Sequence, residues 1–349
     1  MLPSISSPSR PHSYQCSRRN RSTLSFRTIR FLTGPGRVHA SSILSSPRYL
    51  SNRQNLYHLV SRPNFTGYWI IQSSFEKPQP PKNSDITIFY LHGGGYFSSQ
   101  PGTYLLFLLR LAETILAQGS SVSMFALDYH LAPEYCYPTQ LREAAAAYGY
   151  LINEQSIPPE KIVIAGDSAG AHLALSFLVD LQSSKRKLPK PGGLVAVSPW
   201  LSLNHTPSTN TERDVLSAPF LEATARRFLG PSFKEEDKFS PTLEFLTPQP
   251  AIDWDAILPS WIWVSAGTSE VLFDDIVKWV QMLEGRLGRQ RVEYAFAQGE
   301  IHAWQWLETT DEGAKSRFLE KDGRPNEFRG VEQIGKLIGG KAYASGKNE

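Results

Sequence analysis

A serine between small residues is the strongest sign of chemistry in this chain. The stretch 166–170 reads Gly-Asp-Ser-Ala-Gly. An apolar run at 161–165 precedes it and a helix-forming run at 171–178 follows, so the pattern predicts a strand, a sharp turn and a helix. Small neighbours permit the strained backbone that projects a serine hydroxyl toward a substrate. We therefore expect Ser168 to be a nucleophile, the alternative being an ordinary serine at a strand–helix turn.

A second motif, His-Gly-Gly-Gly at 92–95, directly follows a predicted strand at 86–91. Glycine backbone can approach a substrate closely, and its amides can bind the negative charge that develops on a carbonyl oxygen. The predicted oxyanion hole consists of the amides of Gly94, Gly95 and Ala169. The residues expected to support the two motifs are His92, Gly93 and Asp167. A phosphate-binding glycine loop is the alternative, but neither the lysine that would follow it nor dinucleotide spacing is present.

A serine hydroxyl is too weakly acidic to attack an ester unaided, so a histidine base is required. His302 fits because it comes after the last predicted strand, 292–296. A carboxylate must orient its ring, and the order of nucleophile, acid and histidine puts that carboxylate after the preceding strand. We choose Glu270 over Asp274 and Asp275, since the two aspartates fit better in a first helical turn, near the positive end of the helix dipole.

The elements that must position these residues alternate from about residue 66 onward. Short β-rich runs followed by longer helical stretches predict a mostly parallel sheet with helices on both faces. Several strands are apolar throughout, as strands buried on both faces are. Strands are predicted at 68–72, 86–91, 122–127, 161–165, 194–197, 261–265 and 292–296. Helices are predicted at about 102–117, 139–154, 169–183, 218–229, 272–286 and 328–338.

A chain of 349 residues, 41% hydrophobic and 20% charged, suits one large catalytic domain. We predict this domain at 48–349, preceded by a leader at 1–47. The segment 201–259 breaks the alternation and is rich in proline and threonine, which predicts a cap insertion, with 48–65 as a further candidate part of a lid. A lid of this kind would lie above the carboxyl ends of the strands, where open α/β sheets form their sites.

The net charge of +3 does not indicate a nucleic-acid partner. Ten arginines, and no lysine or acidic residue, precede Glu76, whereas 26 basic residues stand against 33 acidic ones in the rest. The folded body is thus acidic. The longest apolar run, 104–109, is far shorter than the roughly 20 residues of a membrane-spanning helix.

The Ser-, Arg- and Pro-rich leader has the composition of an organellar targeting peptide, of a disordered tail or of a misassigned start. It lacks the apolar core of a secretory signal. Cys136 has no partner within the body, since Cys16 lies in the leader, and this is consistent with a reducing compartment. We expect an intracellular protein, cytosolic or, if the leader targets it, mitochondrial.

The motifs together resemble the hormone-sensitive-lipase-like family of α/β hydrolases, from about residue 66 to 338. The blocks that carry the resemblance are 92–95, 128–134 (Asp-Tyr-His-Leu-Ala-Pro-Glu), 166–170, 198–200 (Ser-Pro-Trp), 210–216, 240–241, 270–275 and 302–303. The resemblance implies the α/β-hydrolase fold with a partly helical cap, and an esterase that needs neither cofactor nor metal. This chain departs from the family at Glu270 and Val271, where Asp followed by Pro is usual, and at His130, where Arg is common.

We therefore expect an ester hydrolase that forms an acyl-enzyme on Ser168 and takes a small, apolar ester, with a short acyl group favoured. Trp200 and Trp304 are weak candidates for the pocket wall, because tryptophans are as often core residues. Two alternatives remain: a binding protein on the same fold, whose usual mark is loss of the histidine, or an acyltransferase, lactonase or amidase with the same triad. The sequence does not indicate an oligomeric state.

Overall fold

The predicted apolar strands form the middle of one eight-stranded sheet in the computed structural model, which describes residues 36–183, 188–204, 214–246, 252–323 and 327–346. The strand order is β1-β2-β4-β3-β5-β6-β7-β8. The strands are β1 (His58–Arg62), β2 (Phe65–Ile71), β3 (Ile86–Leu91), β4 (Val122–Leu127), β5 (Ile162–Asp167), β6 (Gly193–Val197), β7 (Trp261–Gly267) and β8 (Val292–Ala297).

Only β2 runs opposite to the other seven strands. β1 pairs antiparallel with β2, and β2 pairs antiparallel with β4. All pairs from β4 through β3, β5, β6 and β7 to β8 are parallel. The expectation of a mostly parallel sheet with helices on both faces is confirmed.

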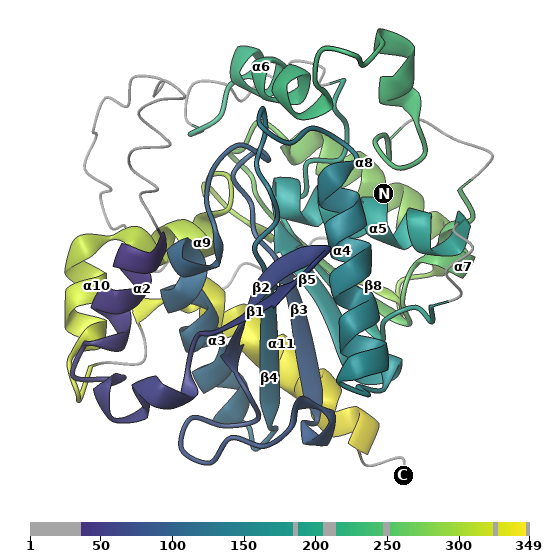
Figure 1. Cartoon of the computed structure of the whole chain (residues 1–349). Helices are drawn as coiled ribbons and strands as arrows, with labels where there is room; N and C mark the ends of the chain where they lie inside the picture. Colours follow the sequence, from purple (N-terminus) through teal and green to yellow (C-terminus); the bar gives the residue numbers. More distant parts are fainter. Residues whose placement is uncertain (1–35, 184–187, 205–213, 247–251, 324–326, 347–349) are drawn as a thin grey trace, which may run out of the picture.

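Side chains along each central strand alternate between two hydrophobic cores, as the two-residue period of a strand requires. In β3, Phe89 and Leu91 belong to one core and Ile88 and Tyr90 to the other. Helices α4, α5 and α8 cover the first core, and α2, α3 and α11 cover the second (Figure 1). These helices are α2 (Gly36–Leu44), α3 (Leu105–Leu116), α4 (Thr139–Gly149), α5 (Ala169–Ser183), α8 (Phe273–Leu287) and α11 (Arg329–Gly346).

All seven predicted strands and all six predicted helices are present; β3, β4, α5 and the helix at 218–229 have the predicted ends, and the ends of the others are shifted. The helix predicted at 102–117 begins with a 3-10 turn, η3 (Pro101–Tyr104), and the one predicted at 139–154 ends in a π-helical turn, η4 (Tyr150–Glu154). Strand β1 was not predicted, because it is a short, mostly exposed edge strand without a clear apolar alternation. Residues 58–62 therefore extend the sheet and do not contribute to a lid. Further short helices are α7 (Trp254–Ile257), α9 (Trp304–Leu307) and α10 (Glu312–Leu319).

Packed structure begins before the boundary predicted at residue 47. Helix α2 packs against η3 and α3, and its side chains Ala40 and Ile43 are only 2% and 4% exposed. The next segment is fixed by Arg48, whose guanidinium contacts both carboxylate oxygens of Glu113 on α3 at 2.8 and 2.9 Å. The first part of the predicted leader, 1–35, lies outside the described residues.

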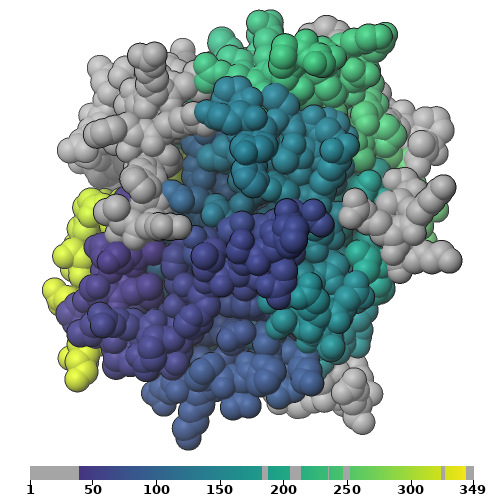
Figure 2. All heavy atoms as spheres, in the orientation of Figure 1, coloured from purple at the N-terminus to yellow at the C-terminus, as the bar shows by residue number. Residues whose placement is uncertain are grey.

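The predicted insertion lies between the end of β6 and the start of β7, and its described part contains α6 (Ala218–Leu229), η6 (Glu235–Phe239) and α7. In Figure 1 α6 lies beyond one end of the sheet, and in Figure 2 the green surface of this segment adjoins the blue loops beneath it. Two ring contacts fix this arrangement. Tyr96 stacks on Phe228 with 3.7 Å between the ring centroids, and Phe97 makes an edge contact with Phe220 at a centroid distance of 5.8 Å. Helix α6 therefore covers the loop that follows β3.

The burial of α2 predicts that it contributes to the stability of the domain. Ile43→Ala should lower the free energy of unfolding by about 2 kcal/mol, since it leaves a cavity in a packed core. Urea titration followed by intrinsic fluorescence measures this change. Ser42→Ala, on the exposed side of the same helix, is the matched control. Equal stability of the two variants would mean that α2 is not docked in solution.

Candidate active site

Ser168 occupies the sharp turn between β5 and α5 that the pentapeptide predicts. Its φ of 53° lies in the left-handed region, which is strained for a residue with a side chain. The turn is held by the amide of Ser168, which donates to the carbonyl of Val197 at 2.9 Å, and by the amide of Trp200, which donates to the carbonyl of Ser168. Gly170 is required here, because a Cβ at this position would lie 2.0 Å from the carbonyl oxygen of Leu91.

The carboxylate of Asp167 ties this turn to the His-Gly-Gly-Gly loop. Asp167 is 3% exposed and accepts hydrogen bonds from the hydroxyls of Tyr90 and Tyr104 at 2.7 and 2.8 Å, and from the amide of Gly93 at 2.9 Å. Burial raises the pKa of Asp167, and the three donors oppose that rise. Burial and the nearby carboxylate also raise the pKa of both tyrosines, so the tyrosines remain protonated donors.

The loop after β3 is fixed at its first residue, His92, by packing and a hydrogen bond, and it continues with the glycine amides expected to bind the oxyanion. His92 is buried and stacks on Tyr129 at 4.1 Å, and the Tyr129 hydroxyl donates to the His92 carbonyl. Burial lowers the pKa of His92 to about 4, which suits a neutral structural ring. Gly94 has a φ of 102°, a conformation that favours glycine. Within the described ranges, no residue accepts a hydrogen bond from the three amides expected to form the oxyanion hole, those of Gly94, Gly95 and Ala169.

The structure brings Glu270 and His302 together in a buried pair. The Nδ1 of His302 lies 3.4 Å from Oε2 of Glu270, and the two residues are 5% and 0% exposed. Burial raises the pKa of Glu270, against the favourable interactions with His302 and with the Ser198 hydroxyl. Burial lowers the pKa of His302, but interactions with Glu270, Asp214 and Asp167 outweigh it, so the net pKa is raised.

The two rival carboxylates lie elsewhere. Asp274 and Asp275 occupy the first turn of α8, where Asp274 is exposed and Asp275 lies 3.6 Å from the Lys278 ammonium. Among the described residues, Glu270 is the carboxylate within ion-pair distance of the His302 ring. The geometry therefore favours Glu270 as the partner of the histidine.

Two polar residues that the sequence does not predict individually bind the backbone next to this pair. The Ser198 hydroxyl accepts from the amide of Ala303 at 3.0 Å. Asp214, from the insertion, accepts from the amides of Val271 and His302 at 2.8 and 3.0 Å. Both residues lie in blocks, 198–200 and 210–216, that resemble the hormone-sensitive-lipase-like family. The resemblance of these blocks to the family could have drawn attention to Ser198 and Asp214. Their positions in the sequence give no reason to expect contacts with the loops of the acid and the base.

The two tryptophans proposed for the pocket wall make packing contacts. Trp200 is 1% exposed and belongs to the core beneath α5. Trp304 packs against the start of α11, since a Cβ at Gly330 would lie 2.6 Å from its ring. A role for either ring in substrate binding stays a prediction.

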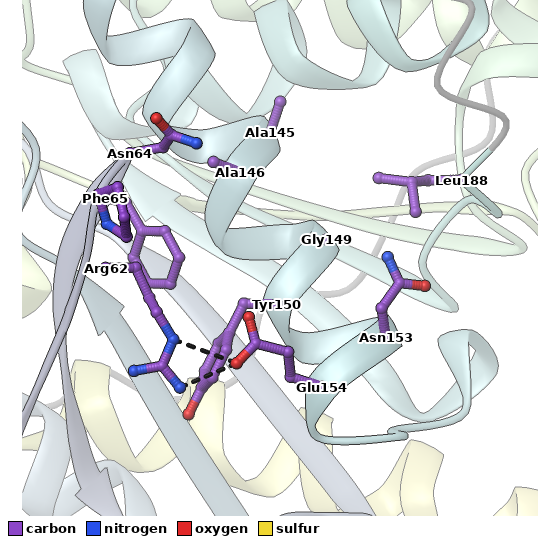
Figure 3. A pocket seen from close by; sticks show the side chains of 11 residues that line it. Arg62, Asn64, Phe65, Ala145, Ala146, Gly149, Tyr150, Asn153, Glu154 and Leu188 are labelled. Carbon is purple, nitrogen blue, oxygen red and sulfur yellow. Dashed lines mark hydrogen bonds and ion pairs between the residues drawn. The ribbon is translucent and has the colours of Figure 1, made fainter.

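A surface hollow of about 470 Å³ lies between the β1–β2 turn and α4 (Figure 3). Its walls include Phe65, Tyr150 and Arg62, whose guanidinium pairs with Glu154. None of the candidate site residues lines it. In the described part of the chain, no three side chains of the kinds that bind metals cluster together, and no helix is both long and apolar enough to cross a bilayer.

Comparison with known proteins bears on this geometry. A family model described as alpha/beta hydrolase fold matches residues 88–306, a range that contains every candidate catalytic residue. The chain belongs to this α/β-hydrolase family. The α/β-hydrolase fold that the resemblance implied from the sequence is thereby confirmed.

The relatives of this α/β hydrolase include proteins from Streptomyces, Acinetobacter and Salmonella. It is 29% identical to an acetyl-hydrolase of Streptomyces hygroscopicus, over 65% of this chain and 71% of that protein. It is 32% identical to an esterase of Acinetobacter venetianus, over 54% of this chain and 58% of the relative. An acetyl esterase of Salmonella choleraesuis is 29% identical over 68% of this chain and 71% of its own length.

Solved structures agree on the fold of the hydrolase. An esterase from the bacterial hormone-sensitive lipase family superposes with a TM-score of 0.66 at 22% identity, covering 93% of this chain and 94% of that one. The esterase EstE5, soaked with p-nitrophenyl butyrate, superposes with a TM-score of 0.64 at 21% identity, covering 88% and 92% of the two chains.

The hydrogen bonds to Asp167 predict a measurable contribution of Tyr104 to stability. Tyr104→Phe removes one donor from a buried carboxylate and should lower the free energy of unfolding by about 2 kcal/mol. Urea titration at neutral pH measures it. Tyr135→Phe, at a tyrosine that is 47% exposed, should leave stability unchanged. If Tyr104→Phe were as stable as this control, the hydrogen bond to Asp167 would make no net contribution to the free energy of unfolding.

Proposed function

We propose that this ester hydrolase works through an acyl-enzyme on Ser168, with His302 as general base and Glu270 as its charge partner. The observation that carries the proposal is the buried Glu270–His302 pair, in which Nδ1 lies 3.4 Å from Oε2. The strained turn at Ser168 supports it, since a nucleophile elbow needs this conformation. The names of the relatives, acetyl-hydrolase and esterase, support the ester class of substrate.

In the first half-reaction the Oγ of Ser168 attacks the ester carbonyl carbon as its proton passes to Nε2 of His302. The carbonyl oxygen becomes an oxyanion, which the amides of Gly94, Gly95 and Ala169 bind. One such donor typically contributes about 3 kcal/mol to stabilisation of the transition state. Glu270 stabilises the imidazolium ion and holds Nδ1 protonated. The tetrahedral intermediate collapses, the C–O bond to the alcohol breaks, and the alcohol oxygen takes the proton from Nε2.

In the second half-reaction water attacks the acyl-enzyme carbonyl carbon while Nε2 of His302 accepts its proton. The ester bond to Ser168 then breaks, and Oγ takes the proton back as the carboxylic acid leaves. All groups are regenerated, so the cycle needs no cofactor. An alcohol in place of water would give acyl transfer, with the same residues in the same roles.

The substrate we propose is a small apolar ester with a short acyl group. Two observations support a short acyl group: the relatives named for acetyl esters, and the close packing of α6 on the oxyanion loop, where a Cβ at Gly95 would lie 2.7 Å from the Thr224 methyl group. We expect p-nitrophenyl acetate and butyrate to be hydrolysed faster than decanoate.

The nucleophile is tested by Ser168→Ala, which should reduce turnover of p-nitrophenyl acetate by at least about a thousandfold without loss of folding. A fluorophosphonate probe should label Ser168 in the wild type, as mapped by mass spectrometry, and should leave the variant unlabelled. If Ser168→Ala retained more than a thousandth of the wild-type rate, another nucleophile would be at work. A folded wild type with neither label nor turnover would instead favour a binding protein.

The base is tested by the pH dependence of kcat/KM, which reports groups of the free enzyme. His302 must be neutral to accept a proton, so activity should fall as the pH drops through its pKa, which lies above the ordinary histidine value. Glu270→Gln removes an interaction that raises this pKa. The acidic limb should therefore move to lower pH while the maximal rate falls by at least about a hundredfold.

Glu270→Asp is the matched control, because it keeps the charge and restores the acid that is usual in the resembled family. It should retain most of the activity and an acidic limb near that of the wild type. If Glu270→Gln left both the rate and the limb unchanged, the carboxylate partner of His302 would have to be another residue.

A further inference from the structure

We propose that Asp214 is a positioning residue that joins the acid loop and the base loop, so that the insertion between β6 and β7 helps to assemble the active site. The inference rests on the proposed function, since it concerns how Glu270 and His302 are held. Nothing in the chemistry of the ester requires this residue. Its role follows from its contacts.

The carboxylate of Asp214 accepts from three backbone amides in three separate segments. Its Oδ2 accepts from the amide of Val271 at 2.8 Å, directly after the acid Glu270. Its Oδ1 accepts from the amide of His302 itself at 3.0 Å and from that of Val215 at 2.7 Å. One side chain therefore fixes the spacing between the backbone of the acid loop and that of the base loop.

The backbone position of His302 matters because, among the described residues, Nδ1 of its ring makes no hydrogen bond of ordinary geometry. The 3.4 Å contact with Glu270 lacks ordinary hydrogen-bond geometry, and neither Glu270 oxygen makes such a bond to any described residue. The backbone that carries the ring is fixed separately, at two successive amides. There, the amide of His302 is held by Asp214 and the next amide, that of Ala303, by the Ser198 hydroxyl.

Asp214 also adds negative charge beside the pair. The carboxylates that face His302 are Glu270 from the loop after β7, Asp214 from the insertion and Asp167 from the end of β5, and all three raise the pKa of His302. The same charge of Asp214 raises the pKa of Glu270. Asp214 should therefore favour the protonated histidine that forms during attack, in addition to holding it.

The bond to Val271 depends on a departure of this chain from the resembled family. Where Val271 stands, proline is usual, and proline has no amide hydrogen to donate. In this chain the insertion thus gains a hydrogen bond to the acid loop that a proline would not allow. Val271→Pro removes this amide donor and leaves the charge of Asp214 in place, which separates the two parts of the proposed role.

The test compares Asp214→Asn with Val271→Pro in the full-length protein, using p-nitrophenyl acetate. In Asp214→Asn the charge and one acceptor are lost, so kcat should fall by about 10- to 100-fold with a small change in KM, and the acidic limb of kcat/KM should move to lower pH. In Val271→Pro, kcat should fall by about tenfold with the acidic limb near its wild-type position.

The matched control is Asp253→Asn, in the same insertion. Asp253 also accepts from two backbone amides, those of Asp255 and Ala256, but these bonds cap α7, and no contact of Asp253 with the candidate site is found among the described residues. Its kcat and pH profile should equal those of the wild type. Near-ultraviolet circular dichroism and thermal unfolding check that each variant is folded.

Wild-type kcat and an unmoved acidic limb in folded Asp214→Asn would overturn the inference while leaving the proposed function intact. If Asp214→Asn does not fold, Val271→Pro decides, because a wild-type kcat in that variant contradicts the positioning role and a reduced kcat supports it. Failure of the proposed function has a different signature, namely a wild type without turnover or an active Ser168→Ala, and the inference would then fall with it.

Discussion

The parallel register of β3, β5, β6, β7 and β8 is the constraint on which the candidate site depends. It sets Leu91 opposite Gly166, Asp167 opposite Val197, Val197 opposite Ser265 and Gly267 opposite Ala297. Each of these residues lies at or near the carboxyl end of its strand, so the loops that follow begin side by side at one edge of the sheet. Residues as far apart in sequence as Ser198 and Ala303, 105 positions, are thereby brought within hydrogen-bond reach, and open α/β sheets usually form their sites in this way.

Buried carboxylates at this edge are stabilised to different degrees, and the difference suits their proposed roles. Asp167 accepts three hydrogen bonds, and the one from the amide of Gly93 connects the turn at Ser168 to the oxyanion loop. Glu270 is fully buried without a hydrogen bond of ordinary geometry among the described residues, and burial raises its pKa. A carboxylate in that setting gains most when its partner becomes charged, because the interaction between opposite charges is strong in a medium of low polarity. Protonation of His302 during attack is the event that provides this gain.

The insertion between β6 and β7 contacts the site from two directions. Through α6, Phe220, Thr224 and Phe228 pack on the loop that carries the oxyanion amides. Through Asp214, four residues before the first residue of α6, it contacts the backbone next to the acid and that of the base. The insertion therefore contacts both the loop expected to bind the oxyanion and the loops that carry the acid and the base. On this view the insertion is part of the catalytic framework as well as a cover for it.

The sequence by itself determined the central strands, the main helices and the residue types able to do the chemistry, because apolar periodicity and glycine-rich turns are local properties. It did not determine β1, whose exposed edge position leaves little pattern, or the packing of α2 ahead of residue 48. The sequence favoured Glu270 over Asp274 and Asp275, which lie within the same six residues, and the contact of Glu270 with His302 supports that choice. Asp214 contacts the amides of residues 57 and 88 positions further along the chain. Only the tertiary structure decides such contacts, because backbone amides carry no mark in a sequence and become partners only when the sheet brings their loops together.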